Sequence, residues 1–287
     1  MAETERGKWL RESRAGYLTA PERDTVANLL DQLERECRDQ IARVILFGSR
    51  ARGDYEPESD IDLLIVTRDG KSEVDGIIKH LSRDEPYWSI LVMSAEQYQE
   101  HQWLRDPLYV NVRRDGVELW DPKQWRVEEE AVPLDFEEGE PRVMDKATKE
   151  TINIYLGLAR DALDDARYLR KGKRLRATNS KAYYAAHYAL VAALFALNVV
   201  RSKHSGVQAA LSQFLVKPGH IEEEHKDIFK ELREIREDSD YEPRFVPDEA
   251  QTVRLLAGAE RFVARMEEFL KEHGAFDNDE EDSTEDG

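Results

Sequence analysis

Residues 42–66 read ARVILFGSRARGDYEPESDIDLLIV, and the organisation of the N-terminal half can be inferred outward from them. The apolar runs at the two ends are short enough to be strands, and a polar stretch that opens with Gly48 and Ser49 separates them. Residues two apart on a strand point to the same face. Asp60 and Asp62 are therefore predicted to lie side by side at the start of the second strand.

Two neighbouring carboxylates beside a glycine turn suit phosphate chemistry. The oxygens of Asp60 and Asp62 can hold one or two Mg²⁺ ions. The Gly48–Ser49 turn leaves backbone N–H groups free to approach a triphosphate, and Arg50 and Arg52 would add positive charge. In-line attack at phosphorus needs this set of groups. A lone Asp-x-Asp usually decorates a solvated strand edge, but a preceding strand that ends in Gly-Ser favours the catalytic interpretation.

The elements around this segment alternate in type. The pattern predicts a helix over 19–37, strands over 42–47, 61–66 and 87–93, and a helix over 72–81 before the last strand. A further helix is predicted to start near Ser94. This order indicates a small mixed α/β domain of the α+β kind at residues 1–120.

The second half of the chain has a different pattern. Residues 121–142 hold three prolines and eight acidic residues and are predicted to be an acidic linker. Apolar residues then recur at helical spacing, which predicts an all-α helical bundle at 143–274. A nearly all-apolar helix at 180–200 is expected to lie at its centre. Residues 275–287 carry seven acidic residues and are predicted to be a disordered tail.

The segment Gly48–Asp62 resembles the minimal nucleotidyltransferase signature of the polymerase-β-like superfamily: Gly-Ser, ten residues, then Asp-x-Asp. The resemblance implies transfer of a nucleoside monophosphate from ATP or another NTP, with Mg²⁺; the sequence does not specify the nucleobase. It makes Gly48 and Ser49 triphosphate contacts, and Asp60 and Asp62 metal ligands. The family's third carboxylate lies on the next strand, where this chain has Ser89. Either Asp84 or Glu85, just before that strand, substitutes for it, or the site uses two carboxylates.

The helical half is similar to the HEPN domain over residues 144–272. The similarity rests on three segments: NSKAYYAAHYA at 179–189, SKHSGV at 202–207 and REDSDY at 236–241. Active HEPN ribonucleases have an arginine followed after four to six residues by a histidine. Here Tyr241 follows Arg236 at that spacing, so the ribonuclease activity is not carried over. RNA binding and homo-oligomer formation through this domain stay open.

Three functions follow from the resemblances. The first is an enzyme that adds AMP to a protein tyrosine in a toxin–antitoxin-like system, on itself in trans or on another HEPN protein, with Tyr241 as the candidate acceptor. The second is a small-molecule nucleotidyltransferase of the aminoglycoside type. A cationic acceptor would suit the net charge of −18. The third is a non-catalytic binding or assembly module.

Composition restricts the partners and the cellular location that can be expected for this protein. The acidic charge argues against broad binding to duplex nucleic acid, which requires clustered lysine and arginine. A single cysteine, Cys37, excludes an intramolecular disulfide. The polar start of the chain and the absence of a long uninterrupted apolar segment predict a cytoplasmic protein without a membrane partner.

Overall fold

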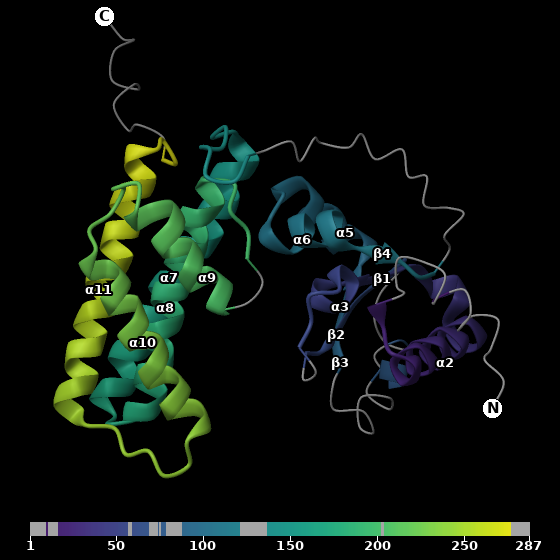
Figure 1. Ribbon diagram of the computed structural model, residues 1–287, viewed down its shortest axis with the longest axis horizontal. Helices are drawn as coiled ribbons and strands as arrows, with labels where there is room; N and C mark the ends of the chain where they lie inside the picture. The colour runs from purple at the N-terminus through teal and green to yellow at the C-terminus, as the bar shows by residue number, and fades with distance from the viewer. Residues whose placement is uncertain are drawn as a thin grey trace, which may run out of the picture. The chain divides into compact units, whose positions relative to one another are not determined.

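The computed structural model describes residues 10, 17–56, 59–68, 74, 76–78, 88–120, 137–201 and 204–276. Contacts divide the chain into two compact units, Met1–Leu134 and Asp135–Gly287. The first is a sheet with helices and the second is helical (Figure 1). In the part of the chain that the structure describes, no helix has both the length and the apolar character needed to cross a membrane.

The N-terminal unit is built on a four-stranded sheet with the order β3-β2-β1-β4. Strand β1 (Ile41–Phe47) pairs antiparallel with β2 (Ile61–Thr67) and with the short β4 (Val117–Glu118). Strand β2 pairs parallel with β3 (Trp88–Ser94). The three predicted strands are confirmed to within one residue. The two-residue strand β4 was not predicted, because it is too short to show a period.

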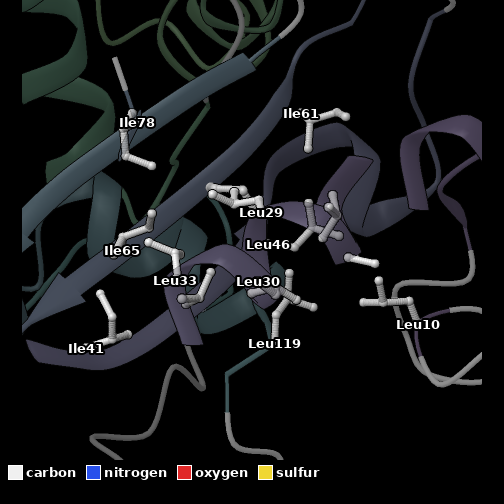
Figure 2. Close-up of a cluster of buried hydrophobic side chains, with 14 of the residues drawn as sticks. Leu10, Leu29, Leu30, Leu33, Ile41, Leu46, Ile61, Ile65, Ile78 and Leu119 are labelled. Carbon is white, nitrogen blue, oxygen red and sulfur yellow. The ribbon is translucent and has the colours of Figure 1, made fainter. Parts of the chain in front are cut away.

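Helix α2 (Ala20–Cys37) covers one face of the sheet. Thr19 and Glu22 form a capping box at its start, as the sequence there favours. Its leucines pack against β1 and β2 in a buried layer (Figure 2). This layer includes Leu29, Leu30, Leu33, Ile41, Leu46 and Ile65. Burial of each such side chain contributes roughly 1.5–3 kcal/mol to folding.

Helices α5 (Ala95–Leu104) and α6 (Pro107–Asp115) cover the other face. Ser94 caps α5 as predicted, whereas α6 was missed although Asp106 and Pro107 are typical of a helix start. Side chains along a strand point alternately to the two faces of the sheet. Asp62 therefore lies on this second face, the same face as Leu64. Of the predicted helix 72–81, the structure describes residues 74 and 76–78, which are helical; the rest lies outside the described residues.

The C-terminal unit is a bundle of four long helices with a shorter helical segment between the second and the third. The long helices are α7 (Lys146–Lys171), α8 (Leu175–Ala196), α10 (Glu224–Tyr241) and α11 (Glu249–Glu272). The shorter segment comprises α9 (His204–Ala210) and the π-helical turn η3 (Leu211–Val216). Helix α8 packs against the other three long helices, which confirms the predicted central helix. Its buried alanines allow close approach of the neighbouring backbones.

Residues on both sides of the predicted bounds 143–274 contact the helical bundle. Before it, the Gly139 N–H donates to Leu197 O (2.9 Å) and the Arg142 N–H donates to Ala196 O (2.8 Å). The Arg142 guanidinium also lies 3.7 Å from the centre of the Phe195 ring. After it, Ala275 is buried, and its N–H donates to Leu270 O (3.0 Å). Residues 121–136 of the predicted linker and 277–287 of the predicted tail lie outside the described residues.

Candidate functional site

Gly48 joins β1 to the short helix α3 (Gly48–Arg52) in a conformation that few other residues adopt. Its φ is +76°, in the left-handed region. A Cβ atom at this position would lie 2.2 Å from Asp62 Oδ2 and 3.0 Å from Asp62 Cγ. The Gly48 backbone therefore lies directly against the Asp62 carboxylate. The structure thus brings together these two predicted site residues, with the buried Ser49 next to them.

Asp60 and Asp62 lie at the beginning of β2. Asp62 is half-buried and is paired in register with Phe47 of β1 and Ser89 of β3. Asp60 is exposed and immediately precedes the strand. The alternation of an extended chain places both carboxylates on the face that α5 and α6 cover. The pair therefore lies at an edge of this face that opens to solvent at Asp60.

Ser89 lies beside Asp62, on the strand to which the resemblance assigns a third carboxylate. The parallel register pairs Ser89 directly with Asp62, and its side chain is exposed. Asp84 and Glu85, the two predicted substitutes, lie outside the described residues. Among the residues described, no group of three or more His, Cys, Asp or Glu could hold a metal ion. The described site thus offers the Asp60–Asp62 pair as its acidic groups.

Arg50 is buried, with 4% of its surface exposed. Its Nη2 lies 2.9 Å from Glu22 Oε1 on α2. Its Nε and Nη2 also donate to the carbonyl oxygen of Ser59, at 3.3 and 3.1 Å. The ring of Tyr55 covers the guanidinium, 3.9 Å from ring centre to Cζ. The structure thus directs this predicted phosphate contact inward, toward the loop that precedes Asp60.

Arg52 is more accessible, with 23% of its side chain exposed. Its Nη1 lies 2.7 Å from Asp115 Oδ2, and its Nη2 lies 3.2 Å from Asp54 Oδ1. Burial acts to raise the pKa of Asp115, but hydrogen bonds from Arg114 and Arg52 outweigh it and lower that pKa. Sequence reasoning missed Asp115, because it belongs to the unpredicted helix α6 and follows Arg52 by 63 positions.

Tyr241, the candidate acceptor, ends helix α10, and 70% of its surface is exposed. Arg236 Nη2 donates to the hydroxyl oxygens of Tyr241 (3.2 Å) and Tyr184 (2.9 Å). Arg236 also forms an ion pair one turn along the helix, with Nε 2.8 Å from Asp240 Oδ2. The neighbouring Tyr183 is buried, and burial raises its pKa to about 12.

Two family models match the chain. A model described as "Nucleotidyltransferase domain" matches residues 28–169, and one described as "HEPN domain" matches residues 152–269. The first match contains the whole of the Gly48–Asp62 segment. The second contains α8 and α10, and the two matches overlap in α7.

Three curated relatives match different parts of this chain. A "UPF0332 protein" of Thermotoga maritima is 33% identical over 124 residues, which are 43% of this chain and 94% of that protein. A protein of Methanocaldococcus jannaschii named "Putative toxin MJ0605" is 30% identical over 130 residues, 45% of this chain and 96% of that protein. "Putative protein adenylyltransferase MJ0141" of the same organism is 47% identical over 57 residues, 19% of this chain and 58% of that protein.

Proposed function

We propose, from the premise that this chain belongs to the proteins in which a nucleotidyltransferase domain is followed by a HEPN domain, that it transfers AMP from ATP to a protein tyrosine. The system would be a toxin–antitoxin-like one, and relatives named as an adenylyltransferase and as a toxin support this proposal. One observation carries the transferase part. A glycine with φ of +76° lies so close to Asp62 that a Cβ would be 2.2 Å from the carboxylate.

The residues at this place fit a hard divalent cation. Two carboxylates two residues apart supply oxygen ligands, and the absence of a side chain on Gly48 lets its backbone lie against one of them. Asp60 and Asp62 would hold Mg²⁺, which supplies charge neutralisation on the α-phosphate and on the leaving pyrophosphate.

The remaining steps belong to the chain and to the acceptor. In the proposed reaction the acceptor oxygen forms a bond to the α-phosphorus, the bond from that phosphorus to pyrophosphate breaks, and the hydroxyl proton passes to solvent. Arg52, held by Asp54 and Asp115 at a partly exposed position, is the arginine that we propose to face the triphosphate.

We propose Tyr241 as the acceptor. Its exposure allows a phosphorus atom to approach the hydroxyl, and the hydrogen bond from Arg236 fixes the position of that oxygen. Tyr183 is a poor candidate, because it is buried and its pKa is raised to about 12, so that both access and loss of the proton are disfavoured. Modification would occur in trans if the two units cannot bring Tyr241 to Asp60 within one chain.

Incubation of the full chain with ATP and Mg²⁺ is expected to add AMP at Tyr241. We expect Tyr241→Phe to remove this modification, because the phenylalanine ring offers no oxygen to attack. Peptide mapping by mass spectrometry measures it. Tyr168→Phe is the matched control, since Tyr168 is a tyrosine of the same unit with 77% of its surface exposed.

Other outcomes separate the parts of this proposal. AMP on other residues only, retained in Tyr241→Phe, would refute Tyr241 as the acceptor but keep protein adenylylation. Transfer to an aminoglycoside with no AMP on protein would replace the protein acceptor with a cationic small molecule.

We also propose that the HEPN domain does not cleave RNA. Attack by a 2′-hydroxyl needs a group that takes its proton, and the position at histidine spacing after Arg236 holds Tyr241. Single-stranded RNA incubated with the full chain and with Arg236→Ala is therefore expected to remain equally intact on a denaturing gel. Cleavage by the unmodified chain that disappears in Arg236→Ala would contradict this prediction.

A further inference from the structure

The two arginines of the Gly48–Gly53 segment have different surroundings. The Arg52 side chain is partly exposed, whereas Arg50 is 4% exposed and lies under the ring of Tyr55. A triphosphate could reach the Arg50 guanidinium only after Tyr55 had moved and the Glu22 pair had opened. Its location therefore argues for a role other than phosphate binding.

The atoms that Arg50 contacts suggest this role. Two of its N–H groups donate to Ser59 O, and this carbonyl belongs to the peptide unit that joins Ser59 to Asp60. The guanidinium thus fixes the orientation of the backbone directly before Asp60. In the part of the chain that the structure describes, the Asp60 side chain has no hydrogen-bond or ion-pair partner of its own. The direction of that carboxylate consequently depends on its backbone.

Glu22 completes the arrangement from the other side. It belongs to the first turn of α2, where one carboxylate oxygen accepts from the Thr19 N–H (2.7 Å) and the other lies 2.9 Å from Arg50 Nη2. The position of Arg50 is therefore fixed relative to α2, which packs on the sheet through its leucines. Glu22, Arg50 and Ser59 form a continuous chain of contacts from this helix to Asp60.

We infer that Arg50 is a positioning residue for the metal site: through Ser59 it sets the Asp60 carboxylate relative to Asp62, and Glu22 holds Arg50 in place for this task. The inference rests on the proposed function, because it takes Asp60 and Asp62 to be the metal ligands. It assigns Glu22, a residue outside the Gly-Ser and Asp-x-Asp motif, to the same machinery. Loss of either residue should weaken metal binding and leave the contact with the triphosphate intact.

Two titrations of the full chain separate metal binding from phosphate binding. Calorimetry with Mg²⁺, in the presence of a non-hydrolysable ATP analogue, gives the metal dissociation constant. Calorimetry with the analogue at saturating Mg²⁺ gives the nucleotide dissociation constant. For Arg50→Met and Glu22→Gln we expect the metal constant to rise about tenfold, the lower end of the range for loss of a residue that supports a metal ligand. The nucleotide constant should change less than twofold.

A double variant tests whether the two residues act together. If Glu22 works only through Arg50, Glu22→Gln added to Arg50→Met should weaken metal binding no further, because residues of one contact chain are not additive. Circular dichroism and thermal unfolding check that each variant is folded. If Arg50→Met fails to fold, Glu22→Gln, which keeps the arginine and the shape of its partner, gives the same readout.

The possible failures are distinguishable. Unchanged metal constants in both folded variants would overturn the positioning role and leave the proposed transferase untouched. A nucleotide constant that rises in Arg50→Met at saturating Mg²⁺, with normal metal binding, would make Arg50 a triphosphate contact instead. A wild-type chain that binds neither Mg²⁺ nor the analogue would overturn the proposed function together with this inference.

Discussion

Replacement of both Asp60 and Asp62 by asparagine is expected to abolish nucleotidyl transfer while the chain stays folded. The two carboxylates are the acidic groups of the described site, and asparagine keeps their shape but removes the charge that holds a divalent cation. Metal ions contribute several kcal/mol to transition-state stabilisation, so the rate should fall by roughly 10³-fold or more. Release of pyrophosphate from ATP, with and without acceptor, measures the loss.

The stability of the same variant is part of the prediction. Two neighbouring carboxylates repel one another when no metal lies between them, so the variant should unfold at the same temperature as the wild type or slightly higher. Asp39→Asn is the matched control: Asp39 is an exposed aspartate just before β1, and its replacement should leave transfer unchanged. Normal transfer by the double variant would refute the assignment of the site.

The strands and the acidic pair could be predicted because they depend on local patterns. Apolar runs of strand length gave β1, β2 and β3, and the period of two placed Asp60 and Asp62 on one face. The spacing of Gly-Ser from Asp-x-Asp indicates the nucleotidyltransferase family, and the model of that family matches residues 28–169. The nearly all-apolar character of residues 180–200 likewise predicted the central helix α8, because a helix that is apolar all round is buried.

The partners of the two arginines could not be predicted in this way. Arg50 and Arg52 are equivalent in the sequence, two residues apart in one basic run, and both suit a phosphate. Their difference comes from residues that are remote in the chain. Glu22 on α2 pairs with the buried guanidinium of Arg50, and Asp115 on α6 pairs with the partly exposed guanidinium of Arg52. Periodicity contains no information on such pairings, because they depend on how the helices pack on the sheet.

Gly48→Ala is expected to impair the proposed site strongly, although it adds only one methyl group. Alanine at a φ of +76° costs roughly 1–2 kcal/mol in backbone strain. Its Cβ would also lie 2.2 Å from Asp62 Oδ2, so the carboxylate or the backbone must move. A displacement of about 1 Å at a reacting centre lowers rates by about 10²-fold. We therefore expect both the free energy of unfolding and the transfer rate to fall.

Gly219→Ala separates the two causes. Gly219 has a φ of +84°, and a Cβ there would meet nothing within 4 Å. This variant should consequently show the loss of stability due to backbone strain alone, with normal transfer. Urea unfolding and pyrophosphate release are measured on both variants. If Gly48→Ala loses no more activity than Gly219→Ala, the close approach of Gly48 to Asp62 is not what the reaction requires. A selective loss in Gly48→Ala, with weaker Mg²⁺ binding, would mean that the close approach of the glycine backbone to Asp62 keeps this carboxylate in the position that the metal requires.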